Sequence, residues 1–508
     1  MKIFNLHYSQ WARIIILIGA IWRISAYLVI NPSLWLDEAK FAIKTDEFSF
    51  SQLWNPDAHP TASEEIKAQT GPLGFFFLTK VLTLYFGNHE YVLRFIPLLT
   101  GILGIYFFYL LAQKILSPRG ALLALAFFSF SPILINFSFD FHPYSSDVFI
   151  AVIFSHLFLT LDQRDMKMKE ALLRGMILAI LLWFSSPAIF VFLGISTVLF
   201  YHYFSKKEWS KLKILSIMII FNLTSFSINY FSYLTYFISS QPITTYWKQF
   251  LIPNLPFSIS SFKFLCNFLF TQFFFYAPLF FIKYSLLAFL LFAFGGYLLF
   301  FQKRLKFFLL IGPLLITILA SIFQKYPFIG RTIVFLTPIA YILIAAGIEK
   351  TISVLRNLQP GRWTWILIFL ILSIYIQQGI TTLILTTSKS TNEDLAPVLV
   401  EVRKRAQKTD LLYIYCGAQA QFEYYHQRFE LQGLPTVYGI DSREDPQRYL
   451  QDINRLRGRG RVWFIFSHIW EDEDIVYLDH LDHIGKMLIS IPSWNAGAFL
   501  YDLSDPKE

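Results

Sequence analysis

Charged side chains are scarce in this chain of 508 residues: Asp, Glu, Lys and Arg together make up 15% of it. An average soluble protein carries about 25%, and a chain this long with so few charges would need an implausibly large core to fold in water. Hydrophobic residues make up 55% of the sequence. They occur in runs close to the roughly 20 residues that a helix needs to cross a bilayer. The scarcity of charge therefore excludes an ordinary soluble protein and indicates a membrane protein.

Cysteine is scarcer still, because Cys266 and Cys416 are the only two in the sequence. They cannot supply a disulfide framework, and their spacing is not that of metal ligands. His480 and His483 lie three residues apart in an acidic segment. A metal site needs a third convergent ligand, so we interpret this pair as a solvated helix face. The sequence predicts no metal site and requires no cofactor, although a divalent cation could assist the chemistry proposed below.

The net charge of +9 does not indicate nucleic-acid binding, because most Lys and Arg residues fall in short loops between apolar runs. The positive-inside rule places such loops in the cytoplasm. The first apolar run lacks a small-residue cleavage site, so we interpret it as an uncleaved span with a cytoplasmic N-terminus. The five basic loops lie at 114–119, 164–174, 206–213, 303–306 and 350–362.

The apolar runs predict about eleven helical spans, since a membrane segment must satisfy its own backbone hydrogen bonds. A further apolar segment at 264–282 is predicted to be interfacial or re-entrant, because a span there would move the basic loop at 303–306 to the outside. The stretch 72–86 is too short to span comfortably. The predicted spans are 11–30, 92–115, 119–138, 145–161, 171–186, 187–204, 212–238, 284–301, 305–323, 331–348 and 363–386.

Two domains follow from this pattern. Residues 1–386 form the membrane domain, which includes a long outer loop at 31–91, and residues 387–508 form a polar C-terminal domain outside the cytoplasm. Helical and strand patterns alternate in this tail, which predicts a small α/β domain. The predicted helices are 393–407, 446–456 and 474–489, and the predicted strands are 411–415, 462–467 and 498–503.

The first candidate functional group is Asp37–Glu38, directly after the first span. A carboxylate at the membrane boundary can act as a general base on a hydroxyl, and partial burial would raise its pKa towards a useful value. The alternative is that acidic residues end the span because water begins there. Spacing alone slightly favours this alternative.

The second group lies in a tight outward loop and at the start of the next helix. Charged groups at membrane depth are usually functional, and a helix N-terminus favours anions. The alternative is that Ser145 or Ser146 caps the helix. The candidate substrate-binding residues of this group are Asp140, His142, Tyr144 and Asp147.

Two arginines complete the set. Arg331 opens the span 331–348, where its side chain could snorkel or hold a phosphate. Arg94 stands at the start of the second span, and a local ion pair with Glu90 is the alternative there. The predicted topology puts all these groups on one side of the membrane. A base and an arginine at the lipid surface suit transfer chemistry on a lipid phosphate, with the arginine stabilising the departing phosphate.

Four segments resemble the GT-C superfamily of membrane glycosyltransferases, in particular the family-39-like branch related to protein mannosyltransferases and to the aminoarabinose transferase of lipid A. The resemblance covers about three quarters of the chain, and it rests on the order of the motifs more than on any one of them. The segments are Trp35–Ala39, Gln69–Leu73 with the following Phe86–Gly87 and Glu90–Arg94, Phe141–Asp147, and Tyr326–Arg331.

The resemblance implies a GT-C fold in a bacterial inner membrane, a polyprenyl-phosphate sugar donor, and inversion at the anomeric carbon. It implies that Asp37 is the catalytic base and that Glu38 supports the acceptor, which is a lipid, a polysaccharide or a protein. Many relatives carry Lys or Arg where this chain has His142. Either His142 is protonated, or Arg331 and Arg94 bind the phosphate in its place.

Two other functions remain open from the residues themselves. A transporter or lipid flippase would place charged or broken helices near the bilayer midplane, ideally in two related halves. The sequence has no internal repeat, and its polar residues gather at one face. A non-catalytic scaffold would tolerate the loss of Asp37.

Overall fold

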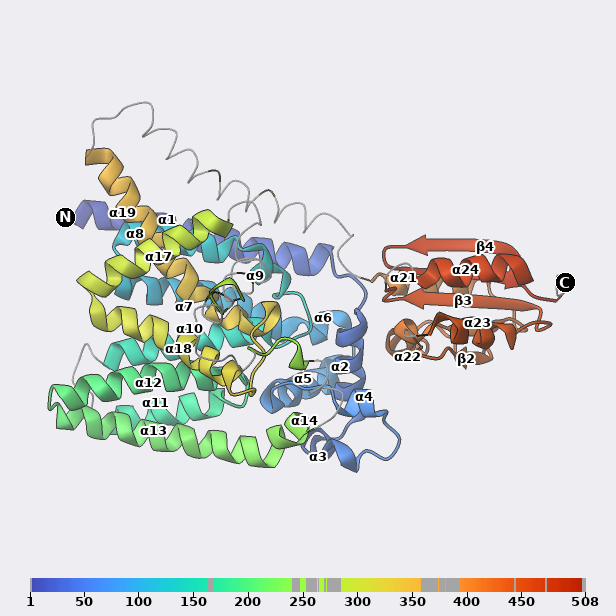
Figure 1. Ribbon diagram of the computed structural model, residues 1–508, viewed down its shortest axis with the longest axis horizontal. Coiled ribbons are helices and arrows are strands. Elements are labelled where there is room, and N and C mark those ends of the chain that lie inside the picture. The colour runs from blue at the N-terminus through green and yellow to red at the C-terminus, as the bar shows by residue number, and fades with distance from the viewer. Residues whose placement is uncertain are drawn as a thin grey trace.

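The computed structural model describes residues 2–161, 168–239, 247–252, 285–357, 393–442, 445–470 and 473–504, with a few isolated positions between 263 and 380. A helical bundle forms the larger part, and an α/β domain lies at one end of it (Figure 1). The predicted segments 264–282 and 363–386 fall almost entirely outside the described residues. The number of eleven spans therefore stays a prediction.

Apolar helices make this chain an integral membrane protein. Within the described ranges, six helical stretches are long and apolar enough to cross a membrane: Tyr8–Val29, Glu90–Ile115, Ala188–Ser205, Trp209–Phe237, Arg304–Ile322 and Gly330–Val354. The bundle contains α1 (Lys2–Val29), α7 (Phe95–Ile115), α8 (Pro118–Ser129), α9 (Pro132–Asn136), α10 (Tyr144–Leu161), α11 (Met168–Leu181), α12 (Ala188–Ser205), α13 (Trp209–Asn229), α14 (Thr235–Ser239), α17 (Ser285–Gln302), α18 (Arg304–Ile322) and α19 (Thr337–Asn357).

Helix α19 is the buried centre of the bundle, whereas α1 presents most of its surface outward. Two glycines let α17 pack directly on α19. A Cβ atom added at Gly295 would meet the Leu343 carbonyl oxygen at 1.8 Å, and one at Gly347 would meet the Leu291 carbonyl oxygen at 2.3 Å. Small residues allow this kind of close backbone approach between membrane helices.

The single helix predicted at 119–138 is wrong, because the chain breaks between α8 and α9. Pro132 lacks an amide hydrogen and forces the preceding residue into an extended conformation, which ends α8. The buried Arg23 of α1 then donates hydrogen bonds to two carbonyl groups at the end of α8, those of Ser129 (2.8 Å) and Phe128 (3.3 Å). The hydrophobicity pattern gave no sign of this break.

The predicted outer loop at 31–91 is a layer of helices. It contains α2 (Leu36–Glu47), α3 (Phe50–Trp54), α4 (Glu64–Lys67), α5 (Leu73–Phe86) and α6 (Glu90–Leu93). We call these five helices the outer layer. In Figure 1 they lie at the end of the bundle that faces the C-terminal domain.

The C-terminal domain is an α/β domain, as predicted. Its sheet has the order β2-β1-β3-β5-β4, with β1 parallel to β2 and β3, and β5 antiparallel to β3 and β4. The elements are α21 (Leu395–Arg405), β1 (Leu411–Ile414), α22 (Gln419–Tyr425), β2 (Thr436–Tyr438), α23 (Pro446–Asn454), β3 (Arg461–Ser467), α24 (Glu473–Ile484), β4 (Lys486–Ser493) and β5 (Ala496–Asp502).

The predicted helix 474–489 is too long. Helix α24 ends at Ile484. The next residue is Gly485, and glycine destabilises a helix interior, so the helix stops there. Lys486–Ser493 then forms strand β4 and pairs with β5. Helix α22 and strand β2 were not predicted.

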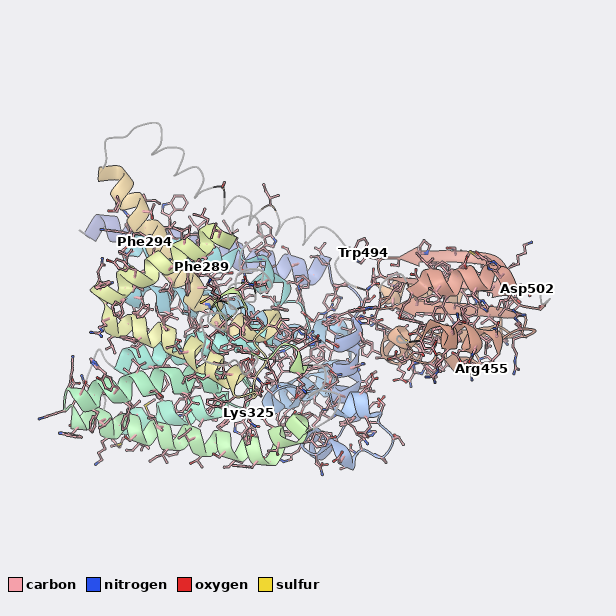
Figure 2. The ribbon with its side chains drawn as sticks, in the orientation of Figure 1. Phe289, Phe294, Lys325, Arg455, Trp494 and Asp502 are labelled. Atoms are coloured by element: carbon pink, nitrogen blue, oxygen red, sulfur yellow. The ribbon has the colours of Figure 1, made fainter. Side chains whose placement is uncertain are left out.

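One hydrophobic cluster joins the outer layer to the C-terminal domain. Leu34 and Phe41 from the first part of the chain belong to the same buried cluster as Leu395, Tyr425 and Trp463. Figure 2 shows the opposite ends of this domain: Trp494 lies near the bundle, and Asp502 lies far from it. The domain is therefore seated on the outer layer by a continuous apolar core.

Candidate active site

Asp37 lies in the first turn of α2 and forms an ion pair with Arg331, 294 residues away. The Arg331 Nη1 to Asp37 Oδ2 distance is 2.9 Å, and the two side chains are 30% and 26% exposed. Arg331 is in a 3₁₀ helix, η5 (Gly330–Leu336), which precedes α19. Arg331 does open the apolar stretch Gly330–Val354, but the first part of that stretch is 3₁₀ rather than α-helical. The partial exposure leaves both charged groups accessible to a substrate.

Two tryptophan rings flank the Arg331 guanidinium, at 5.7 Å for Trp35 and 5.6 Å for Trp247. Cations bind favourably over indole faces. These contacts hold the charge beside Asp37.

Glu38 and Arg94 form a second pair, which is buried. Arg94 donates to both carboxylate oxygens of Glu38, at 2.9 and 2.6 Å, and neither side chain is more than 1% exposed. Glu38 also accepts hydrogen bonds from the backbone amides of Phe141 and Trp35. Burial raises the pKa of the Glu38 carboxyl, and the Arg94 guanidinium and the Phe141 amide oppose that shift. This pair joins α2, the start of α7 and the loop before α10.

The local ion pair between Glu90 and Arg94 is absent, so that alternative is wrong. Glu90 pairs instead with Arg428 of the C-terminal domain, at 2.8 Å. Arg94 turns the other way and also donates to Asn31 Oδ1 (3.0 Å) and to the Pro32 carbonyl (2.8 Å).

Asp140 and His142 lie behind Trp35. Asp140 Oδ1 accepts a hydrogen bond from Trp35 Nε1 (3.3 Å) and lies 3.0 Å from His142 Nδ1. Burial opposes ionisation of Asp140, but His142 and Trp35 outweigh it and lower the pKa of the Asp140 carboxyl. The His142 ring is stacked against the rings of Trp35 and Tyr144, with centroids 5.4 and 5.2 Å away.

Tyr144 and Asp147 both lie in the first turn of α10. Asp147 is buried, and its Oδ1 atom has no hydrogen-bond partner among the described residues. The alternative that Ser145 caps this helix is not supported, because the Ser145 hydroxyl donates to the Pro97 carbonyl (2.9 Å). Ser146 Oγ lies 3.4 Å from the Thr100 hydroxyl.

Three of the predicted groups therefore meet. Arg331 contacts Asp37 and Trp35, and Trp35 in turn donates to Asp140. Glu38, the residue next to Asp37, and its partner Arg94 are shielded from solvent. The arrangement offers one accessible carboxylate, one accessible guanidinium, and a buried polar scaffold that holds them.

Sequence reasoning missed the residues of the C-terminal domain that touch this region. Glu393, Gln421 and Tyr425 all hydrogen-bond to the segment just before Asp37. No local signal marks contacts between residues more than 350 positions apart. Trp35 was recognised only as part of a motif, and Trp247 was not recognised at all.

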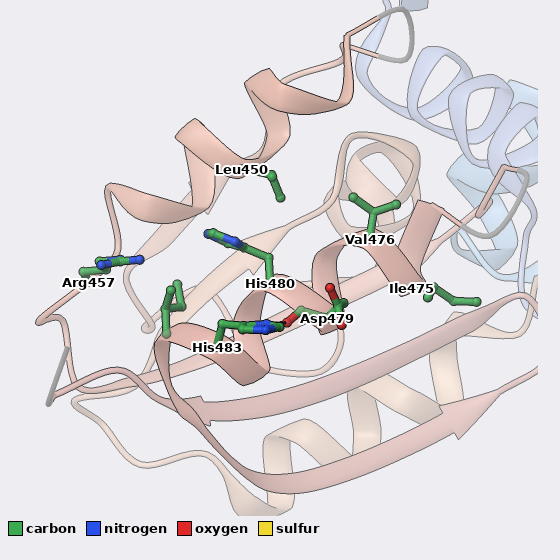
Figure 3. A pocket seen from close by; sticks show the side chains of 8 residues that line it. Leu450, Arg457, Ile475, Val476, Asp479, His480 and His483 are labelled. Atoms are coloured by element: carbon green, nitrogen blue, oxygen red, sulfur yellow. Dashed lines mark hydrogen bonds between the residues drawn. The ribbon is translucent and has the colours of Figure 1, made fainter. Parts of the chain in front are cut away.

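Two cavities in the described part of the chain lie away from Asp37. A cavity of about 620 Å³ lies between α23 and α24 and is lined by Leu450, Arg457, His480 and His483, among others (Figure 3). His480 Nε2 pairs with Asn454 Oδ1, at 2.9 Å. No group of three or more His, Cys, Asp or Glu residues within the described ranges is arranged to hold a metal ion.

Comparison with known proteins identifies the fold. Residues 70–231 match the sequence profile of a family described as dolichyl-phosphate-mannose-protein mannosyltransferase. The crystal structure of ArnT from Cupriavidus metallidurans bound to undecaprenyl phosphate superposes with a TM-score of 0.54 over 97% of this chain and 98% of that one, at 12% identity. The chain has the GT-C fold.

The GT-C fold implied by the four motifs is thus confirmed. The apo structure of the same ArnT gives a TM-score of 0.52 with the same coverage and identity. An apo oligosaccharyltransferase from Archaeoglobus fulgidus gives 0.50 at 12% identity, over 97% of this chain and 74% of that one. No curated protein sequence matches the chain.

Proposed function

We propose that this GT-C protein transfers a sugar from a polyprenyl-phosphate donor to an acceptor hydroxyl at the extracytoplasmic face, with Asp37 as general base. The observation that carries the proposal is the partly exposed ion pair between Asp37 and Arg331. Two comparisons support the donor class. A similar fold was crystallised with undecaprenyl phosphate, and the matching family is described by a dolichyl-phosphate sugar.

The proposed reaction is a single displacement. The acceptor oxygen attacks the anomeric carbon on the face opposite the phosphate, and its proton passes to the Asp37 carboxylate. The bond between the anomeric carbon and the phosphate oxygen breaks, and its electron pair leaves with the polyprenyl phosphate. Arg331 stabilises the negative charge that develops on this leaving group. Inversion at the anomeric carbon follows from the attack geometry.

The other predicted residues take supporting roles in this proposal. Glu38 and Arg94 are buried, so we assign them to positioning rather than to substrate contact. Asp140 orients Trp35, which in turn packs on Arg331. Asp147, with its unpaired oxygen, and Tyr144 are assigned to the sugar or the acceptor. His142 is enclosed by two aromatic rings and paired with Asp140, so we assign the phosphate to the more exposed Arg331.

The orientation of the chain and its domain boundary are also proposals. The basic loops place the N-terminus in the cytoplasm and the C-terminal domain outside. The boundary near residue 387 lies among residues that the structure does not describe. The acceptor can be a lipid, a polysaccharide or a protein.

The function is tested with the purified full chain in lipid vesicles. With a lipid, polysaccharide or protein acceptor supplied, we expect it to release undecaprenyl phosphate from undecaprenyl-phosphate mannose or from undecaprenyl-phosphate aminoarabinose as the sugar passes to that acceptor. Movement of either lipid across the bilayer without release of undecaprenyl phosphate would instead support a flippase.

An Arg331→Gln variant is expected to raise the donor KM by about 10–100-fold, because a hydrogen bond to a charged group contributes about 1.5–3 kcal/mol. Arg331→Lys should recover part of the loss, since lysine binds phosphate as a point charge. Donor titrations measure both effects. Lys325→Gln is the matched control, because Lys325 is an exposed cation six residues earlier (Figure 2). An unchanged KM in Arg331→Gln would rule out Arg331 as the phosphate ligand.

A further inference from the structure

The short segment Ser33–Leu36, which leads directly into Asp37, is hydrogen-bonded to the C-terminal domain at three of its four residues, Ser33, Leu34 and Leu36. Leu34 donates its amide to the Tyr425 hydroxyl (2.9 Å) and accepts a hydrogen bond at its carbonyl from Gln421 Nε2 (2.8 Å). The Ser33 hydroxyl donates to Asp394 Oδ1 (2.6 Å) and accepts from the Ala396 amide (2.9 Å). Backbone atoms that would otherwise face water or remain unpaired thus have partners from more than 350 residues away.

Glu393 makes the contact closest to the proposed base. Its Oε2 atom accepts hydrogen bonds from the Leu36 amide (2.9 Å) and from Gln421 Nε2 (3.2 Å), and its Oε1 atom pairs with His468 Nδ1. Leu36 is the first residue of α2, and Asp37 is the second. Glu393 therefore binds the N-terminus of the helix that carries Asp37.

This helix cannot cap itself in the usual way. Its N-cap residue is Trp35, whose side chain has a donor and no acceptor. Ser, Thr, Asp or Asn at this position would satisfy a free amide of the first turn. Glu393 supplies the missing acceptor, and its negative charge also suits the positive end of the helix dipole.

The three side chains of the C-terminal domain that hold this segment are themselves buried. Glu393 is 6% exposed, and Gln421 and Tyr425 are fully buried. Tyr425 accepts from Leu34 and donates to Glu90 Oε1 (2.9 Å), which also binds Arg428. Helix α22, which carries Gln421 and Tyr425, packs directly on α2. A shift of the C-terminal domain would therefore move the start of α2.

We infer that the C-terminal domain is a clamp for the proposed base: Glu393, Gln421 and Tyr425 fix the first turn of α2 and so hold the Asp37 carboxylate opposite Arg331. These three are positioning residues, because none of them contacts the ion pair itself. The inference rests on the proposed function for its catalytic consequence. Its structural part stands independently of that function.

The structural part is tested by hydrogen–deuterium exchange on the full chain in detergent. In Glu393→Ala, peptides covering residues 34–39 are expected to exchange roughly 3–30-fold faster, as the loss of a helix cap predicts. Glu393→Gln keeps an oxygen acceptor and should exchange more slowly than Glu393→Ala. Glu401→Ala removes a partly exposed carboxylate from the same domain and serves as the control. Unchanged exchange in Glu393→Ala, or an equal increase in the control, would overturn the clamp.

The catalytic part is tested with the same variants on the undecaprenyl-phosphate sugar that the wild-type chain turns over. Glu393→Ala is expected to lower kcat about tenfold and to leave the donor KM within about twofold, since a misplaced base slows chemistry and does not weaken donor binding. Tyr425→Phe, which removes one hydroxyl, carries the test if Glu393→Ala is not recovered in membranes. A raised KM at constant kcat, or a wild-type kcat, would overturn this part. The proposed function has a separate test: an Asp37→Asn variant with wild-type kcat would overturn it and would leave the exchange result for Glu393→Ala unaffected.

Discussion

An Asp37→Asn variant is expected to lose about 10²–10⁴-fold in kcat, the usual contribution of a general base. An amide of the same size cannot take the proton from the acceptor hydroxyl. Arg331 would be released from its ion pair with Asp37, so the donor KM should stay the same or fall. The combination of a low kcat with an unchanged or lower KM is specific to loss of the base. Release of undecaprenyl phosphate at saturating donor measures it.

The matched control is Asp46→Asn. Asp46 is an exposed carboxylate on the same helix, about 14 Å further along its axis at 1.5 Å per residue. It should keep wild-type activity. Asp37→Glu keeps the charge and displaces it by one methylene group, so an intermediate rate is expected. Wild-type kcat in a correctly inserted Asp37→Asn protein would exclude Asp37 as the base.

The second large effect is expected at the buried pair. Arg94→Met should lower the free energy of unfolding by about 3–5 kcal/mol, because it leaves the Glu38 carboxylate buried without its partner. Arg94 also donates to the 31–33 segment, so the loss should disorder the outer layer beside Asp37. Thermal denaturation in detergent and the amount of protein recovered from membranes measure the effect.

Two comparisons separate a buried-charge effect from a general packing defect. Replacing both partners, with Glu38→Leu added to Arg94→Met, should restore much of the stability, since the uncompensated charge is removed. Lys40→Met breaks the more exposed pair between Lys40 and Glu65, whose Glu65 side chain is 66% exposed. Such pairs contribute about 0–1 kcal/mol. If Arg94→Met proved as stable as Lys40→Met, the Glu38–Arg94 pair would not be the anchor of this layer.

Helix positions in the bundle were predictable because a bilayer demands long apolar runs. The predictions 187–204, 284–301 and 305–323 differ by only one residue at each end from α12, α17 and α18. The break within 119–138 was not predicted, because Pro132 acts locally and the average hydrophobicity of the run is uniform. In the C-terminal domain, the predicted helix 474–489 included the first residues of β4, because only Gly485 separates α24 from β4.

The outer layer was harder to predict. Helix α2 has only 12 residues, and its N-cap is a tryptophan. Acidic residues in the first turn, Asp37 and Glu38, are the start signal that its sequence does carry, but a Ser, Thr, Asp or Asn at the N-cap is missing. The helix forms because tertiary partners supply what its own sequence lacks: Arg94 for Glu38, and Glu393 for the Leu36 amide.

The sequence by itself determined the class of the protein, the GT-C resemblance, and the choice of Asp37 and Arg331 as candidates, because membrane spans and charged motifs are local properties of the chain. Tertiary structure alone decided the pairing. It set Asp37 against Arg331, Glu38 against Arg94, and Glu90 against Arg428. These partners are 56 to 338 residues apart, and a hydrogen bond acts only within a few ångströms, so the folded chain must bring them together before either partner can be assigned a role.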